Sequence, residues 1–173
     1  MQRIYNDEFI AINNSEKNKT IWEIPVCYDL DFGIDLPFLS TEKNLSIEKI
    51  ISIHSQATYT VFGIGFLPGF LYLGGLSEKI HCPRRDTPRM EVPKGAVSIG
   101  GNQTGIYPQT SPGGWQIIGK TPVSMFNIHR EIPCFMNPGD QIKFKPISKD
   151  EFEIIKLDDK TGNYELKKAK DND

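Results

Sequence analysis

Apolar and polar residues alternate near the start of the chain, where TIWEIPVCY places Trp22, Ile24, Val26 and Tyr28 at every second position. A period of two is typical of a strand with one buried face. The polar segment before it, INNSEKNKT, shows no such period. We therefore expect residues 1–19 to form a linker or lead-in, and the ordered domain to begin directly after them.

Helical spacing replaces this alternation in LSIEKIISIHS, where Ile47, Ile50, Ile51 and His54 fall at positions i, i+3, i+4 and i+7. These positions share one face of a helix, and Ser46 directly before them is a favourable N-cap. The pattern predicts a short amphipathic helix. The stretch between the strand and this helix is expected to be a loop.

Short apolar runs dominate the chain after residue 58, in YTVFGIGF, GAVSIGG, GWQIIGKT and QIKFKPI. Segments rich in Gly and Pro separate them, namely LPGF, CPRRDTPR, VPKG, SPGG and NPGD. Many short strands joined by such turns favour a mainly β fold, either a barrel or a sandwich.

The C-terminal segment, residues 149–173, carries two competing signals. Ser148 and Glu151 match a capping box at the start of a helix, whereas FEIIK is strand-like and KTGN is a turn. Both alternatives stay open from the sequence. We expect the segment to extend the domain and its last charged residues to be disordered.

The balance of acidic and basic residues argues against a polyanionic partner such as nucleic acid. The 173 residues include 20 Lys and Arg against 22 Asp and Glu, a net charge of -2, which offers no electrostatic footprint for nucleic acid or an anionic membrane. No apolar run is long enough to span a bilayer, and the N-terminus lacks the apolar segment of a signal peptide. These features predict a cytoplasmic protein without a nucleic-acid or membrane partner.

The spacing of cysteines and histidines argues against a metal centre. Cys27, Cys82 and Cys134 are far apart and odd in number, which fits neither a disulfide framework nor a C-x-x-C motif. His81 and His129 show no metal-ligand spacing with each other or with a cysteine. We expect reduced cysteines and no metal site.

One segment, GGWQIIGKT, satisfies the phosphate-loop pattern G-x-x-x-x-G-K-[ST] letter for letter. A phosphate loop runs directly into a helix that holds the Lys and Thr in its first turn. Here the bulky residues Trp115 to Ile118 suit a strand, and Pro122 biases Thr121 away from the helical region. The sequence therefore predicts a strand over this segment rather than a nucleotide-binding loop.

The chain resembles the family that contains the B subunit of 5-oxoprolinase, the kinase inhibitor KipI and allophanate hydrolase subunit 1 in three linked segments: FGIGFLPGFLYLGGL, CPRRDTPRMEVPKGAVSIGGNQTGIYPQTSPGGWQIIGKTP and PCFMNPGDQIKF. The resemblance extends from about Ile24 to Ile147. It implies a mainly β fold, a cyclophilin-like closed β-barrel with one or two short helices, over residues 20–148. A smaller N-terminal α+β domain precedes the barrel in the family, and this chain is expected to hold none of it. The family pattern also leads us to expect Arg where this chain has Lys120, which keeps the charge without the planar fork.

Three arginines in CPRRDTPR are candidates for binding a carboxylate or phosphate, because the flanking prolines restrict the backbone that carries them. The resemblance favours Arg84 and Arg89 as catalytic residues and Arg85 as a substrate-binding residue. Alternatively, Arg85 is solvated or pairs with an acid such as Asp86. We expect Arg89 to be an exposed loop residue whose replacement leaves the barrel folded.

His54 has two interpretations. It lies on the apolar face of its predicted helix, where a buried, hydrogen-bonded imidazole is common. It also matches the helix histidine of the family, and an imidazole with a pKa near neutrality could pass a proton during amide opening. The resemblance therefore adds His54 to the candidate catalytic residues.

The glycine-dense segment GGNQTGIYPQTSPGGW is the second candidate wall of a pocket. Its glycines either turn the chain at barrel corners or allow a ligand close to the backbone, and both interpretations stay open. Aromatic residues beside LPGF, namely Phe66, Phe70 and Tyr72, are expected to flank the pocket. With Arg85, the predicted substrate-binding residues are Gln103, Thr104, Tyr107, Ser111, Gly113, Gly114, Trp115 and Gln116.

The resemblance implies a role as the B subunit of an ATP-dependent 5-oxoprolinase, which opens 5-oxo-L-proline to L-glutamate together with an A and a C subunit, the KipA-like and LamB/YcsF-like partners. In the family's scheme the lactam oxygen is phosphorylated before water attacks. ATP is then expected to bind with or through the partner subunits, and the chain alone to be inactive. Two alternatives stay open: a part in urea or allophanate metabolism, and a KipI-like inhibitor that binds a sensor histidine kinase.

Overall fold

The computed structural model describes residues 21–169, so the predicted linker over 1–19 and the final charged residues lie outside it. In chain order the elements are β1 (Ile21–Cys27), α1 (Leu36–Lys43), α2 (Ile47–Gln56), β2 (Thr58–Ile64), β3 (Leu71–Gly74), the 3-10 helix η1 (Glu78–Ile80), β4 (Arg89–Val92), β5 (Ala96–Gly100), β6 (Gln103–Ile106), β7 (Ser111–Gly113), β8 (Gln116–Lys120), β9 (Gln141–Ile147), α3 (Lys149–Thr161) and β10 (Lys168–Ala169).

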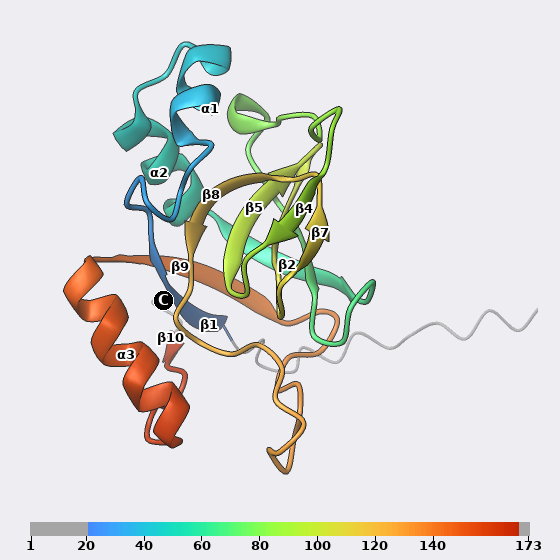
Figure 1. Ribbon diagram of the computed structural model, residues 1–173, viewed down its shortest axis with the longest axis vertical. Coiled ribbons are helices and arrows are strands. Elements are labelled where there is room, and N and C mark those ends of the chain that lie inside the picture. The colour runs from blue at the N-terminus through green and yellow to red at the C-terminus, as the bar shows by residue number, and fades with distance from the viewer. Residues whose placement is uncertain (1–20, 170–173) are drawn as a thin grey trace, which may run out of the picture.

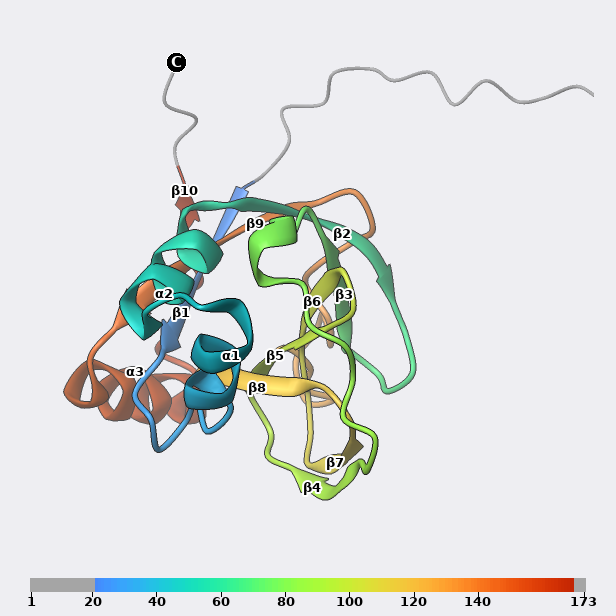
Figure 2. The same cartoon turned by 90° about the horizontal axis from the view of Figure 1, so that it is seen from above.

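Seven strands close into a barrel in the order β1-β8-β5-β6-β3-β2-β9, and β10 pairs with the first residues of β1. Closure depends on β9, which runs parallel to β1 from the pair Ile21–Gln141 to the pair Cys27–Ile147. On the other side, β8 joins β1 at one residue pair, Cys27 and Lys120. Figure 2 shows the strands arranged as a ring, with the β4–β7 ribbon at its edge. The predicted closed barrel is confirmed.

Two groups of buried side chains fill the fold. The larger fills the barrel and includes Ile24, Val97 and Ile118, each fully buried. The smaller lies towards the β4–β7 ribbon and centres on Phe70 and Trp115. The division matters for function because the second group forms the floor of the cavity described below.

Within residues 21–169, three α-helices accompany the barrel, one more than the upper limit of the prediction (Figure 1). The additional helix, α1, occupies the stretch for which the sequence predicts a loop. Its start is marked by Asp35 and a proline in the first turn, and its end by Asn44 in the left-handed region at φ 49°. Leu36 and Leu39 are its buried residues, which give too short an apolar pattern to reveal the helix.

Helix α2 is confirmed. The Ser46 side chain caps it by accepting a hydrogen bond from the backbone N–H of Lys49 at 3.2 Å. Ile50 and His54 are its buried residues, as the spacing predicts. The apolar face of α2 packs against β9.

Helix α3 settles the ambiguity at the C-terminal segment in favour of the capping box. The Ser148 side chain accepts from the N–H of Glu151, while the Glu151 carboxylate accepts from the N–H of Ser148 at 2.8 Å. Phe152 is buried and its ring lies 4.6 Å from that of Phe32. This contact places α3 beside the barrel near β1 (Figure 1).

The segment that imitates a phosphate loop is strand β8, as predicted. Its residues pair with β5, including Ser98 with Ile117 and Ala96 with Lys120. No helix follows at Thr121, and the next helix along the chain is α3. The segment is therefore part of the sheet rather than a loop wound around a phosphate.

Candidate functional site

A cavity of about 280 Å³ lies where the loop between β2 and β3 meets the loop before β4 and the end of β7. We call it the arginine cavity. Its lining includes most of the predicted glycine, arginine and aromatic residues, and consists of Phe66, Phe70, Tyr72, Arg84, Arg85, Pro88, Tyr107, Pro112, Gly113, Gly114 and Trp115. Loops far apart in the sequence therefore share one pocket.

The floor of the arginine cavity is aromatic. The Phe70 ring centroid lies 4.7 Å from Tyr72, 5.0 Å from Tyr107 and 5.6 Å from Trp115. The last two contacts are edge-to-face, a favoured arrangement of aromatic pairs. Phe70, Tyr107 and Trp115 are almost fully buried, so they form a rigid surface on which a flat ligand can pack.

The exposed rim of the cavity includes Phe66, which is 67% exposed and has a left-handed backbone at φ 64°. Such a conformation is unfavourable for a bulky residue. Its ring lies 5.8 Å from that of Phe70, in an edge-to-face contact. The LPGF turn therefore holds an exposed aromatic ring at the mouth of the cavity.

Two glycines let the aromatic rings approach the backbone closely. A Cβ at Gly113 would lie 2.3 Å from the Tyr107 hydroxyl, and a Cβ at Gly105 would lie 2.9 Å from the Trp115 ring. Neither glycine has a positive φ. At these positions the glycines shape the cavity wall by making room for side chains rather than by turning the chain.

Arg84 and Arg85 supply the positive charge of the cavity. The Arg84 guanidinium carbon lies 5.6 Å from the centre of the Trp115 ring, within cation–π distance. The backbone N–H of Arg85 donates to the carbonyl of Gly114 at 2.7 Å, which joins the arginine loop to the glycine loop. No ion pair of Arg84 is found among residues 21–169.

The expected alternative for Arg85, a pair with Asp86, is wrong about the partner. Arg85 Nη1 lies 3.7 Å from Oδ1 of Asp35, a residue distant in sequence. The side chain of Arg85 is 38% exposed, so solvent screens this pair. Arg85 is therefore oriented towards Asp35 while it remains at the cavity.

Asp35 is the residue that sequence reasoning missed. Its side chain is 6% exposed, and Oδ1 accepts a hydrogen bond from Arg89 Nη2 at 2.6 Å while Oδ2 accepts from the backbone N–H of Ile117 at 2.6 Å. The backbone N–H of Asp35 donates in turn to the carbonyl of Ile117 at 2.9 Å. The sequence predicts a loop over this stretch, and no local pattern in GIDLPF indicates that its acid pairs with an arginine 54 positions away.

Arg89 does not line the arginine cavity, and its side chain is 21% exposed because it turns towards Asp35. The expectation of a free, exposed loop residue is therefore wrong. Arg89 Nη1 is buried and has no hydrogen-bond partner among the described residues. A partly buried pair of this kind supports the fold, and its loss costs more than that of an exposed pair.

His54 lies in the barrel core rather than in the cavity. The Thr104 hydroxyl donates to the carbonyl of Ser98 at 3.0 Å, so it accepts from Nε2–H of His54 at 2.9 Å. Nδ1 then accepts from the Tyr28 hydroxyl at 2.8 Å. The ring stacks on Phe144 with centroids 4.6 Å apart, and burial lowers the pKa of His54 to about 3.

This arrangement corresponds to the buried, hydrogen-bonded interpretation of His54. A neutral imidazole with both nitrogens occupied and no exposed surface has no access to a substrate in the arginine cavity. Thr104, which the sequence predicts to bind substrate, is likewise fully buried. Both residues belong to a polar network inside the barrel.

Three further predicted residues do not line the cavity. Gln116 is buried and donates from Nε2 to the carbonyl of Pro83 at 3.1 Å, which holds the start of the arginine loop. Ser111 donates to the carbonyl of Pro112. Gln103 is partly exposed at the start of β6, where it pairs with Gly100.

The arginine cavity is equipped for binding more than for proton transfer. Among the described residues, those that line it include no Asp, Glu, His, Cys or Lys. Burial raises the pKa of the Tyr107 hydroxyl above its ordinary value, so this group stays protonated and can donate a hydrogen bond. The arrangement suits a small molecule with one anionic end, because the Arg84 guanidinium stands over the aromatic floor and Arg85 also lines the cavity.

Comparison with protein families assigns the chain to a family. Residues 2–136 match the carboxyltransferase domain, subdomains C and D. The chain belongs to this family.

Within the described part of the chain, no helix is long and apolar enough to cross a membrane.

Several curated proteins are similar to this chain in sequence. The 5-oxoprolinase B subunit of Bacillus subtilis (strain 168) is 45% identical over 141 residues, which cover 82% of this chain and 59% of that protein. The protein of the same name from Haemophilus influenzae is 51% identical and is covered to 57%, and that from Escherichia coli O157:H7 is 42% identical and is covered to 71%. The chain thus spans between about half and about 70% of these relatives.

Solved structures agree with the barrel. A conserved uncharacterized protein of Pyrococcus horikoshii matches with a TM-score of 0.74 and 48% identity, over 76% of this chain and 61% of that chain. The urea carboxylase of Kluyveromyces lactis matches with a TM-score of 0.75 over 87% of this chain and 16% of that chain. At 20% identity the second likeness shows the fold alone.

The buried imidazole predicts a specific pH dependence of stability. His54 has a pKa of about 3 when folded and 6.5 when exposed, so the unfolded chain binds more protons below pH 6.5 and the folded state loses stability as the pH falls. The loss is about 1.4 kcal/mol per pH unit. We expect His54→Gln to be less stable than the original protein at pH 7.5, with a gap that narrows at this rate below pH 6.5. Urea unfolding between pH 7.5 and 5.0 measures it, and a constant gap would contradict it.

The Asp35–Arg89 pair predicts a difference between two neighbouring arginines. Arg89→Met leaves a buried carboxylate without its closest cation and is expected to lower the free energy of unfolding by about 3 kcal/mol. Arg85→Met removes a longer, screened contact and is expected to cost less than about 1 kcal/mol. Urea unfolding of both variants at pH 7.5 measures the difference. Equal losses would show that Asp35 does not distinguish the two arginines.

Proposed function

We propose that this chain is the B component of an ATP-dependent 5-oxoprolinase, which hydrolyses 5-oxo-L-proline to L-glutamate together with an A and a C subunit. Identities of 42% to 51% to three proteins named as the B subunit of 5-oxoprolinase support the assignment. The observation that carries it is the arginine cavity, where the Arg84 guanidinium lies over the Trp115 ring of an aromatic floor and Arg85 also lines the wall.

The proposed substrate matches this cavity chemically. 5-Oxo-L-proline is a small flat lactam with one carboxylate, and the carboxylate pairs with Arg84 and Arg85. The ring packs on the aromatic floor beside Trp115, where it is removed from water. The protonated hydroxyl of Tyr107 donates to an oxygen of the ligand.

The chain leaves the phosphorylation and the attack of water to its partners. The residues of the arginine cavity offer no general base among those described, and the sequence holds no helix-linked phosphate loop at β8. ATP then binds with or through the partner subunits, and the isolated chain does not turn over 5-oxoproline. A KipA-like and a LamB/YcsF-like protein are the partners in this proposal.

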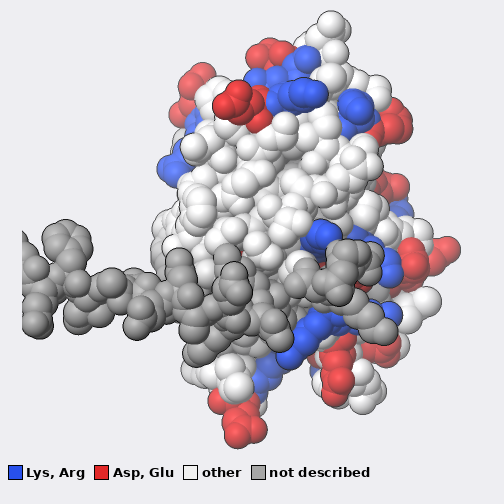
Figure 3. All heavy atoms as spheres, turned by 180° about the vertical axis from the view of Figure 1, so that it is seen from behind, with Lys and Arg blue, Asp and Glu red and all other residues white. Residues whose placement is uncertain are grey.

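An uncharged area of the surface supports the proposal that a partner subunit binds. Figure 3 shows a broad area without Lys, Arg, Asp or Glu on the face opposite to that of Figure 1, while charged side chains gather at its ends. Depletion of charge is typical of the buried centre of a protein interface. Exposed aromatic residues such as Phe62 and Phe66, 66% and 67% exposed, add apolar area to the surface.

The test is reconstitution with the two partner subunits. We expect 5-oxoproline-dependent ATP hydrolysis by the complex and none by the chain alone. Arg84→Gln in the complex is expected to raise the KM for 5-oxoproline by about tenfold or more, because a charge-assisted hydrogen bond to the carboxylate is lost. Lys79→Gln, an exposed position outside the cavity, serves as the control with the same loss of charge.

Two outcomes would overturn the assignment. Turnover of urea or allophanate without turnover of 5-oxoproline would favour the role in urea metabolism. Tight binding to a histidine-kinase dimerisation domain, with no hydrolysis by the complex, would favour the KipI-like inhibitor. An unchanged KM in Arg84→Gln would remove the arginine cavity from substrate binding.

A further inference from the structure

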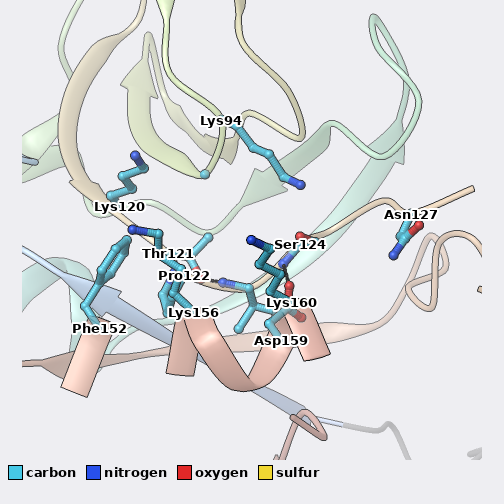
Figure 4. A pocket seen from close by; sticks show the side chains of 12 residues that line it. Lys94, Lys120, Thr121, Pro122, Ser124, Asn127, Phe152, Lys156, Asp159 and Lys160 are labelled. Atoms are coloured by element: carbon cyan, nitrogen blue, oxygen red, sulfur yellow. Dashed lines mark hydrogen bonds between the residues drawn. The ribbon is translucent and has the colours of Figure 1, made fainter. Parts of the chain in front are cut away.

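A second cavity, of about 420 Å³, lies between the barrel and helix α3 (Figure 4). Four lysines line it, so we call it the lysine cavity. Lys94 and Lys120 extend from the barrel side, whereas Lys156 and Lys160 extend from α3. It shares no lining residue with the arginine cavity, so its properties are independent of the function proposed above.

The position of α3 is fixed by contacts on both sides of the lysine cavity. At one end, buried Phe152 packs on Phe32. At the other end, Asp159 Oδ1 accepts from Arg130 Nη2 at 2.8 Å, and Asp159 Oδ2 accepts from the backbone N–H of Ser124 at 3.1 Å. These contacts hold the two walls at a set separation, so the cavity is a built feature of the fold.

The positive charge of this cavity is largely uncompensated. Asp159 is the acid in its lining, and both of its oxygens are occupied by Arg130 and Ser124. Lys156 pairs with Glu153 on the exposed side of α3, with N and O 2.9 Å apart. Among residues 21–169, no carboxylate forms an ion pair with Lys94, Lys120 or Lys160.

Lys120 is the lysine most affected by this environment. Burial lowers the pKa of its ammonium group, the nearby charge of Lys156 lowers it further, and the carboxylate of Glu153 has a smaller, opposite effect. Its Nζ lies 5.7 Å from the centre of the Phe32 ring. Positive groups from opposite walls repel one another, and a bound polyanion would relieve that repulsion.

The floor of the cavity is compact and mostly apolar. Gly95, Pro122, Val123 and Phe152 are buried there, so an organic group has a surface on which to pack. Thr121 is also buried, and its Oγ1 accepts from the backbone N–H of Val123 at 3.3 Å. The Thr121 hydroxyl donates to no described residue, and its proton is therefore available to a ligand.

We propose that the lysine cavity binds small molecules that carry a diphosphate or triphosphate chain, with the phosphate oxygens held by Lys94, Lys120 and Lys160. Lysine binds phosphate as a point charge from any direction, whereas a planar carboxylate is better matched by arginine, which this cavity lacks in its lining. Several cations in one cavity call for more than one negative charge. The volume lies within the range of small-molecule sites.

The helical wall of the cavity lies outside the segment that matches the family. Lys156 and Lys160 lie beyond residue 136, where the match to the carboxyltransferase subdomains ends. Lys120 and Thr121 reach the cavity from the end of a strand, so the site uses the GKT residues without a phosphate loop.

Binding is tested on the full 173-residue chain by calorimetry with inorganic phosphate, pyrophosphate and tripolyphosphate at constant ionic strength. We expect the affinity to rise with the number of phosphates, and Lys120→Met and Lys160→Met each to weaken tripolyphosphate binding by about tenfold. The paired variant Lys143→Met/Lys145→Met removes exposed charge from β9 and is expected to bind as the original protein does.

Two further measurements separate a site from non-specific charge and from loss of folding. Without ligand, Lys120→Met is expected to have an unchanged or higher Tm, because a repelling charge is removed. Tripolyphosphate should shift the amide resonances of Gly95 and Thr121 and leave those of Gly113 and Gly114 unchanged. The proposal is overturned by no binding at millimolar concentration, by equal loss of affinity in the β9 variant, or by equally tight binding of citrate.

Discussion

The buried carboxylate of Asp35 is the constraint on which the arginine cavity depends. Its two oxygens bind Arg89 on β4 and the backbone of Ile117 on β8, and Arg85 lies 3.7 Å from it. One acid in the connection between β1 and α1 therefore holds the arginine loop against the barrel. A charge this deeply buried is stable only with such partners, so the loop has little freedom to move away from the aromatic floor.

Polar groups inside the fold and polar groups at its surface serve different purposes. His54, Thr104 and Tyr28 satisfy one another in the barrel core, so the helix histidine contributes to the fold rather than to a pocket. At the surface, arginines line one cavity and lysines line the other. In one, the Arg84 guanidinium stands over the Trp115 ring, and in the other, lysines extend from opposite walls. The two chemistries suit a carboxylate and a phosphate chain respectively.

Particular residues show how much of the structure could be predicted from the sequence. Alternation in TIWEIPVCY and the cap at Ser46 lead to β1 and α2, whereas the apolar runs and turns after residue 58 left a barrel or a sandwich open, and the closed barrel followed from the family resemblance. Helix α1 was missed because its buried face has only Leu36 and Leu39, too few to show a period. The aromatic and arginine lining of one cavity was foreseen, but Asp35 was not, because the partner of Arg89 is 54 positions away in the chain.

What the sequence determined by itself is local: the first strand, the helix capped by Ser46 and the strand over GWQIIGKT, since periodicity, bulky residues and a following proline act on neighbouring backbone. The tertiary structure decided which polar groups are buried and which face a cavity. His54 became a core residue and Lys120 a cavity residue through packing against β9 and α3. Burial and pairing depend on elements that come into contact only when the barrel closes. A local sequence pattern does not indicate which elements these are.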